Sequence, residues 1–260
     1  MVSVAVQISG APRTVVECAK GIKEAWNSPE YQPHYFLTLW NDQLSKEDED
    51  TVLSCFENCT FLFMHTKDFS TDVARCSHLP TDMDRPENVF HQAYGRKICN
   101  NLRINYEKKN NFKFDIVHIG RPDEIYDCPI RFQLSNIKPR HIYLPNHSQC
   151  SGLNDHGCIA GGLEATAYAD HYTWLVSSLH NAHRERMMTP YKGPFLRRDI
   201  RCRPWITPEF LYEYYLRCKT NLYVIEYPII YKTIRSKFVG VPFAQIPQMS
   251  ANMRERDKWL

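Results

Sequence analysis

The stretch FDIVHIGRPDEIYD, residues 114–127, runs from an apolar segment into a group of charges. Ile116, Val117 and Ile119 predict a buried strand, because short β-branched apolar runs are typical of strands in a core. Gly120 ends this run. One arginine and three carboxylates come next: Arg121, Asp123, Glu124 and Asp127. A strand that is buried along its length and charged at its end points to a ligand site there.

Predicted strands and helices alternate on both sides of this stretch. Further strands are indicated at residues 2–8, 34–40, 59–65 and 141–145, with a strand or strand pair at 221–235. Apolar residues at helical spacing indicate helices at 14–26, 44–56, 88–109, 157–178 and 207–218. Irregular structure is expected at 66–88, at 184–204 and after residue 247. Strand–helix alternation in the amino-terminal half predicts an α/β fold with a mostly parallel central sheet flanked by helices.

Composition and charge exclude several classes of protein. A chain of 260 residues that is 43% hydrophobic is long enough to bury a full core. Its net charge of +3 gives no concentrated basic face, which argues against a nucleic-acid partner. No signal-type segment and no apolar run of ~18 residues is present, so we expect no membrane span and a cytoplasmic protein. The ten cysteines are scattered, and we expect reduced thiols.

Polar residues follow three of the predicted strands. Ser9-Gly10 leads to Arg13, Trp40 leads to Asn41-Asp42, and Gly120 leads to Arg121-Pro122-Asp123. Open α/β sheets bind ligands at the carboxyl ends of their strands, so these groups would share one crevice if the strands are neighbours. An arginine, a close-approach glycine and a carboxylate suit a nucleoside diphosphate with Mg²⁺ or Mn²⁺. The chain has neither GxGxxG nor GxxxxGK[ST], which disfavours dehydrogenases, common methyltransferases and P-loop kinases and favours sugar-nucleotide enzymes.

Four motifs, in order along the chain, resemble those of one family. They are ISGAPRT at 8–14, FLTLW at 36–40, YEKKNNFKFDIVHIGRPDEIY at 106–126 and NDHGCIAG at 154–161. Their order and spacing resemble GT-A-type glycosyltransferases encoded by large DNA viruses of algae, with plant and microbial relatives. The resemblance covers about residues 2–235. It implies one GT-A-like, Rossmann-like domain over 1–245, with a nucleotide-sugar-binding half at about 1–127, an acceptor-side half at about 128–245, and a tail at 246–260.

The resemblance also implies roles for three charged residues. A DxD motif binds the metal and the donor diphosphate in this family, and Arg121-Pro122-Asp123 stands at the matching strand end. Asp123 would face Mn²⁺ or Mg²⁺, with Arg121 neutralising part of the diphosphate; the alternative is a turn-stabilising ion pair. Inverting members carry their general base at the start of the helix that follows the acceptor-side strand. That position is Asp155 in LNDHG; the alternative is that Asn154 or Asp155 only caps the helix.

Other donor contacts rest on weaker patterns. Arg96 and Lys97 are placed at the opening of the helix at 88–109, where a helix amino terminus attracts anions, although the helix also has a packing face. Trp40 would stack on a base or end a buried strand, and burial is favoured. The full set of donor-binding candidates is Ser9, Gly10, Arg13, Trp40, Arg96, Lys97 and Arg121.

Histidines, cysteines and basic residues supply further candidates. His147, Cys150, His156 and Cys158 could bind zinc, but their spacing matches no finger pattern. His180 and His183 receive no assignment. The basic residues of 184–203 would close over the departing nucleoside diphosphate or hold an anionic acceptor, and a solvated loop is the favoured alternative.

Together these patterns predict a glycosyltransferase. It would move a sugar from a UDP- or GDP-sugar to a hydroxyl of a glycan or glycoprotein, in a metal-assisted, inverting reaction. UDP-xylose or a rhamnose donor, and a capsid-protein glycan in the host cytoplasm as acceptor, follow only by analogy with the viral family. A non-catalytic nucleotide-sugar-binding or scaffold protein is the alternative, followed by a zinc-dependent hydrolase.

Overall fold

The computed structural model describes residues 1–12, 14–41, 44–65, 67–75, 87–126, 129–146, 153–177, 208–229 and 231–233. Several predicted features lie outside these residues. They are Arg13, Asp42, His147, Cys150, His180, His183, the whole basic stretch at 184–204 and the tail at 246–260.

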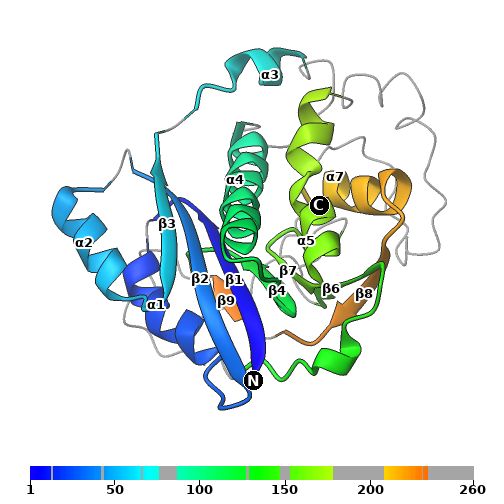
Figure 1. The fold of residues 1–260 in the computed structure, drawn as a ribbon. Coiled ribbons are helices and arrows are strands. Elements are labelled where there is room, and N and C mark those ends of the chain that lie inside the picture. Colours follow the sequence, from blue (N-terminus) through cyan, green and yellow to red (C-terminus); the bar gives the residue numbers. More distant parts are fainter. Residues whose placement is uncertain are drawn as a thin grey trace, which may run out of the picture.

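A seven-stranded sheet forms the centre of the molecule, in the order β3-β2-β1-β4-β7-β6-β8 (Figure 1). β1 pairs in parallel with β2 and β4, β2 with β3, and β6 with β8, whereas β7 is antiparallel to both β4 and β6. The sheet is therefore mixed but mostly parallel, as in Rossmann-like folds. Its strands are β1 (Val2–Gly10), β2 (Tyr31–Trp40), β3 (Cys59–Met64), β4 (Ile116–Gly120), β6 (His141–Pro145), β7 (Cys158–Ala160) and β8 (Tyr223–Tyr227).

Helices cover both faces of this sheet, so the fold has three layers (Figure 1). Successive strand residues point to opposite faces: Ala5 packs with one core cluster, while Val4 and Val6 pack with the other. The Ala5 side holds α4 (Glu87–Lys109), α5 (Gly162–Ala169) and α7 (Pro208–Tyr214). The Val4 side holds α1 (Val15–Glu24) and α2 (Lys46–Ser54).

Short elements complete the described chain. α3 (Ser70–Arg75) follows β3, a 3-10 turn covers Leu134–Asn136, residues 171–177 are helical, and a π-helical turn at Tyr215–Lys219 continues α7. A separate two-stranded antiparallel ribbon joins β5 (Glu124–Tyr126) to β9 (Tyr231–Thr233). α1 lies close against this ribbon, because a Cβ built on Gly21 would be 2.7 Å from Ile125 Cγ1.

The structure confirms the predicted α/β class and the predicted strands, which correspond to β1, β2, β3, β4 and β6 and to the pair β8 and β9, and it corrects two other predictions. Residues 158–160 were expected to be helical but form β7, because this short apolar segment is buried between β4 and β6 and the helix begins only at Gly162. Within the stretch expected to be irregular, residues 70–75 are helical. The segment at 221–235 contains two strands, and they belong to different sheets.

The strands of the central sheet come from both predicted halves of the chain. β1 to β4 belong to the first half and β6 to β8 to the second, and β4 is hydrogen-bonded to β7 across that boundary. Within the described residues, no helix combines the length and apolar character that crossing a membrane requires.

Candidate active site

The carboxyl ends of β1 and β4 meet at one edge of the sheet. The two strands are parallel neighbours, with Ile8 opposite Gly120. Gly10 has φ +149°, which side chains rarely adopt, and a Cβ there would be 3.1 Å from Pro122 Cδ. A glycine is therefore required where the end of β1 passes the turn after β4. This contact confirms that Ser9-Gly10 lies beside the Arg121–Asp123 turn.

Arg121 and Asp123 form a two-pronged ion pair. Arg121 Nε and Nη2 donate to the two Asp123 oxygens at 2.9 and 2.8 Å, and the side chains are 21% and 8% exposed. Burial lowers the pKa of the Arg121 guanidinium, but Asp123, Glu124 and Asp155 raise it further, so it stays above its ordinary value. Three carboxylates therefore lie within the electrostatic reach of one arginine. Nη1 of Arg121 has no partner among the described residues.

Glu124, which the sequence analysis left without a role, lies at the centre of the cluster. Its Oε2 accepts hydrogen bonds from Tyr126 Oη at 2.9 Å and from the Arg121 backbone N–H at 3.3 Å. Its Oε1 faces His156 Nδ1 at 3.4 Å, and neither atom has a hydrogen-bond partner in the described parts of the chain. The Glu124 side chain is 2% exposed. Glu124 and Tyr126 are two residues apart on β5, which puts them on the same side of the strand.

A buried line of hydrogen bonds stands behind Glu124. Trp26 Nε1 donates to His118 Nδ1 at 3.0 Å, and His118 Nε2 lies 3.2 Å from Tyr126 Oη. Burial lowers the pKa of His118 to about 3, so its ring is neutral at pH 7. Because an indole N–H only donates, His118 Nδ1 must accept and Nε2 must carry the proton. The line therefore runs from Trp26 to His118 to Tyr126 to Glu124, with each group donating to the next.

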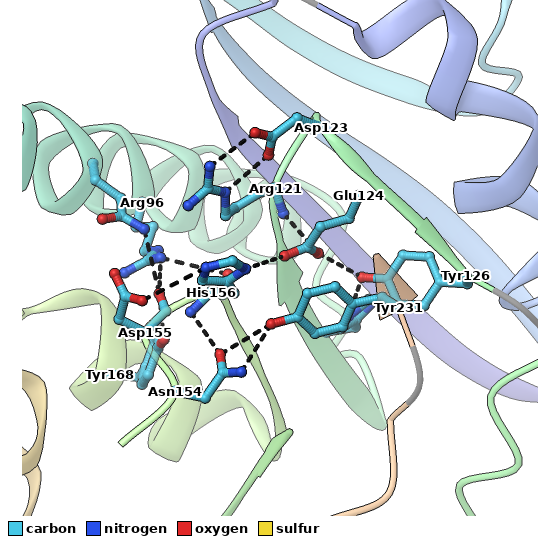
Figure 2. A network of polar contacts seen from close by, with 12 residues as sticks. Arg96, Arg121, Asp123, Glu124, Tyr126, Asn154, Asp155, His156, Tyr168 and Tyr231 are labelled. Carbon is cyan, nitrogen blue, oxygen red and sulfur yellow. Dashed lines mark hydrogen bonds and ion pairs between the residues drawn. The ribbon is translucent and has the colours of Figure 1, made fainter. Parts of the chain in front are cut away.

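The loop at 154–157 lies directly against the end of β4. A Cβ on Gly157 would be only 2.0 Å from the carbonyl oxygen of Ile119, so this position requires glycine. Asn154 Oδ1 accepts from the His156 backbone N–H at 2.8 Å, and Asn154 also hydrogen-bonds to Tyr231 Oη at 2.8 Å. The loop thereby places His156 over Glu124 (Figure 2).

Asp155 lies in this loop, but the local structure differs from the prediction. It precedes strand β7 and not a helix, and the N-cap of α5 is Gly161, so neither Asn154 nor Asp155 caps that helix. Asp155 Oδ1 is 3.9 Å from His156 Nε2, and its side chain is 6% exposed. The Asp155 carboxylate lies within electrostatic reach of Arg121.

Arg96, on α4, supports the backbone of the loop at 154–157. α4 begins at Glu87, so Arg96 lies in the middle of the helix and not at its amino terminus, which corrects the predicted placement of Arg96 and Lys97. The Arg96 guanidinium is buried, donates to the Asp155 carbonyl and to Tyr212 Oη, and lies over the Tyr212 ring. The Asp155 carbonyl also accepts from Gln92 Nε2 and Tyr168 Oη, both at 3.4 Å. Arg96 therefore fixes the loop backbone.

The other predicted donor contacts have different surroundings. Lys97 contacts Thr173 and Asp170, which are outside the cluster. Trp40 is buried, with its ring edge-on to His91 and stacked on Tyr94, which agrees with the favoured burial. Ser9 is buried at the end of β1, and its Oγ has no hydrogen-bond partner among the residues that the structure describes.

No family model and no curated protein matches this sequence. The chemistry of the cluster in Figure 2 therefore has to be inferred from its own residues: two arginines, three carboxylates and an imidazole, built on the tip of β4, β5, the loop at 154–157 and α4.

The donor set does not fit a metal ion as it is arranged. Within the described ranges, no group of three His, Cys, Asp or Glu side chains is placed to hold one. Both oxygens of Asp123, the predicted metal ligand, already accept from Arg121. Of the predicted zinc ligands within the described residues, Cys158 is buried in β7, and burial raises the pKa of its thiol above the ordinary value.

Proposed function

We propose that this protein is a glycosyltransferase that moves a sugar from a UDP- or GDP-sugar to a hydroxyl of a glycan acceptor. One observation carries the proposal: the Arg121 guanidinium lies where the tips of β1 and β4 meet, surrounded by carboxylates, and Nη1 has no partner among the described residues. The carboxyl edge of an open α/β sheet is where such folds bind nucleotides.

Each part of this site has a role in the proposed reaction. Arginine N–H groups match phosphate oxygens, so Arg121 would bind the donor pyrophosphate and balance the charge that develops on it as the sugar leaves. Gly10, which has no side chain, lets the backbone approach that anion. The carboxylates of the cluster bind no pyrophosphate, since like charges repel. The acceptor hydroxyl would lie at the loop at 154–157, which carries the predicted base Asp155 and, next to it, His156.

A ligand screen tests the donor half of this proposal. The protein is screened by thermal unfolding with UDP-, GDP- and dTDP-sugars, each with and without Mn²⁺. We expect one of these donors to raise the midpoint of thermal unfolding. A ligand that binds only the folded state adds about 2.7 kcal/mol at a hundredfold excess over its Kd. The pairs with and without Mn²⁺ also decide whether the cation contributes.

Arg121→Gln should lower the affinity for that donor by about tenfold or more, because it removes the positive charge that would face the pyrophosphate. Arg140→Gln is the matched control: it removes an arginine at the amino-terminal end of β6, the opposite edge of the sheet from Arg121. Equal affinity of wild type and Arg121→Gln for every donor would contradict the assignment of Arg121.

A non-catalytic nucleotide-sugar-binding protein is the second candidate. It is favoured by the engagement of both Asp123 oxygens with Arg121, which leaves the matching DxD position without a ligand oriented to a metal. Release of nucleoside diphosphate separates the two candidates. A transferase hydrolyses its donor slowly even without acceptor, whereas a binding protein returns the donor intact.

A further inference from the structure

Hydrogen bonds fix the orientation of the Glu124 carboxylate, and this orientation determines which carboxylate oxygen faces His156. Glu124 Oε2 accepts a hydrogen bond from the Tyr126 hydroxyl. That hydroxyl accepts one from His118, and His118 accepts one from Trp26. All four side chains are buried. The Arg121 backbone N–H donates to the same oxygen. Turning the carboxylate would break both of these bonds inside the core, where an unsatisfied polar group is strongly unfavourable. Oε1 is thereby fixed toward His156 Nδ1.

We infer that Glu124 is a positioning residue that keeps the proton on Nδ1 when the His156 ring carries a single proton, and that His156 Nε2 is the atom that accepts the proton of the acceptor hydroxyl. The second half rests on the proposed function; the first does not. Both ring nitrogens face carboxylates, but Nδ1 is the nearer: it lies 3.4 Å from Glu124 Oε1, whereas Nε2 lies 3.9 Å from Asp155 Oδ1. Because a carboxylate only accepts, a single ring proton is better placed on Nδ1. The lone pair of the neutral ring is then on Nε2, the nitrogen directed toward Asp155. His118, within the hydrogen-bond line, and His156, next to its Glu124 end, then hold opposite tautomers, Nε2–H at His118 and Nδ1–H at His156.

The surroundings of His156 suit a proton acceptor. A proton taken up at Nε2 leaves an imidazolium between Glu124 at 3.4 Å and Asp155 at 3.9 Å, and the attraction of opposite charges stabilises it. Two positive groups lie near this segment: Arg96 contacts the backbone carbonyls of Asp155 and His156, and Arg121 is within electrostatic reach of Glu124 and Asp155. The Tyr231 ring, 5.5 Å from the imidazole, limits its rotation.

The step balances in atoms and electrons. The acceptor oxygen forms a bond to the anomeric carbon while the bond from that carbon to the phosphate oxygen breaks. The electron pair of the broken bond leaves on the nucleoside diphosphate, next to Arg121. The hydroxyl proton moves to His156 Nε2, and it returns to water after the products leave. Asp155 then stabilises the imidazolium and does not take the proton itself.

Glu124→Gln tests the inference because it reverses the tautomer with little change in shape. The amide oxygen can keep both hydrogen bonds now made by Oε2, and the amide NH₂ then faces His156 Nδ1. Nδ1 becomes the acceptor, the proton moves to Nε2, and the lone pair needed for proton uptake is lost. The turnover number should fall about 100-fold or more, with the KM for the donor within about threefold of wild type.

Glu226→Gln, at an exposed position on β8, is the control and should retain full turnover. Asp155→Asn tests the competing assignment, in which Asp155 is the proton acceptor. If Asp155→Asn abolishes turnover while Glu124→Gln leaves it within about threefold, Asp155 is the proton acceptor and the second half of the inference is wrong.

A measurement without substrate tests the first half by itself. Long-range ¹H–¹⁵N correlation spectra of the histidine rings report which nitrogen is protonated, and His156→Gln identifies the His156 signals by their loss. Wild type should show Nδ1–H at His156, and Glu124→Gln should show Nε2–H. A wild-type Nε2–H signal overturns the assignment of Glu124, whether or not any sugar nucleotide binds. If the tautomers are as expected but no donor is bound or hydrolysed, the proposed function fails and the role of Glu124 stands.

Discussion

Single residues in this protein are determined by what surrounds them in the fold. His118 and His171 are both fully enclosed, and burial lowers the pKa of each imidazole, to about 3 for His118 and well below the ordinary range for His171. His118 is hydrogen-bonded on both ring nitrogens, whereas neither ring nitrogen of His171 has a partner in the described structure. Two histidines of equal burial therefore differ in how well their polar atoms are satisfied.

Stability should fall as the pH drops through the window from about 6.5 toward 3. In that window the unfolded chain protonates these histidines at their ordinary pKa, while the folded protein keeps them neutral. The unfolded state then binds more protons than the folded state. The contribution of these histidines to the free energy of unfolding is therefore complete above pH 6.5 and is lost as the pH falls below it. Each histidine adds up to about 1.4 kcal/mol per pH unit to the slope of the unfolding free energy against pH. Urea unfolding at several pH values measures the slope.

His171→Phe should reduce that slope without lowering stability at pH 7. The ring lies among Tyr212, Trp174 and Tyr215, and phenylalanine removes two buried nitrogens that have no partner in the described structure. An unchanged slope in this variant would show that His171 is protonated in the folded protein.

Gly157→Ala should be strongly destabilising. The added methyl would overlap the Ile119 carbonyl at 2.0 Å, and the loop at 154–157 would have to move away from β4. We expect a loss of about 3 kcal/mol or more, at the upper end of overpacking costs, together with loss of donor turnover. Gly95→Ala is the matched control, since its Cβ would meet Ser9 at an ordinary 3.6 Å and alanine favours the helix. Denaturant midpoints of the two variants should therefore change in opposite directions.

Among the elements, α4 is the scaffold on which the site is built. One arginine in this helix, Arg96, fixes the backbone of the loop at 154–157. A second, Arg103, is buried against Glu107 at 2.6 Å and also reaches the Gly162 carbonyl and Thr166 at the start of α5. The helix therefore ties the loop that precedes β7 to the helix α5 that follows it.

Glu107→Ala should cost about 3–5 kcal/mol, because it leaves the Arg103 guanidinium buried without its carboxylate. The exposed partner of the same carboxylate gives the control: Lys113→Ala removes a side chain that is 75% exposed and should cost about 1 kcal/mol or less. Thermal or urea unfolding measures both. Equal effects would mean that Arg103 finds another partner when Glu107 is removed.

For the whole molecule, strand order decides which residues can act together. β1 and β4 are more than a hundred residues apart in sequence, yet Ile8 lies opposite Gly120, so the turns that follow them share one edge of the sheet. The antiparallel β7 lies on the other side of β4, and its amino-terminal end brings Asp155 and His156 to that same edge. A single reversed strand thus joins the second half of the chain to the site.

The sequence by itself determined the α/β class, most of the strands and helices, and the charged tip of β4, because each of these depends on local periodicity and on which residue types end a strand. Arg121 and Asp123 were recognisable for the same reason, whereas Asp155 was singled out only by the family resemblance.

Only the tertiary structure decided that 158–160 is a strand, that Arg96 is a buried support, and that Glu124 faces His156. β7 exists because β4 and β6 flank it, and a three-residue apolar segment carries no periodicity that separates strand from helix. The Glu124–His156 contact joins residues on separate segments, and its direction comes from a hydrogen-bond line that begins at Trp26 on the far side of the sheet. Those relations depend on packing in three dimensions, which no pattern along the chain encodes.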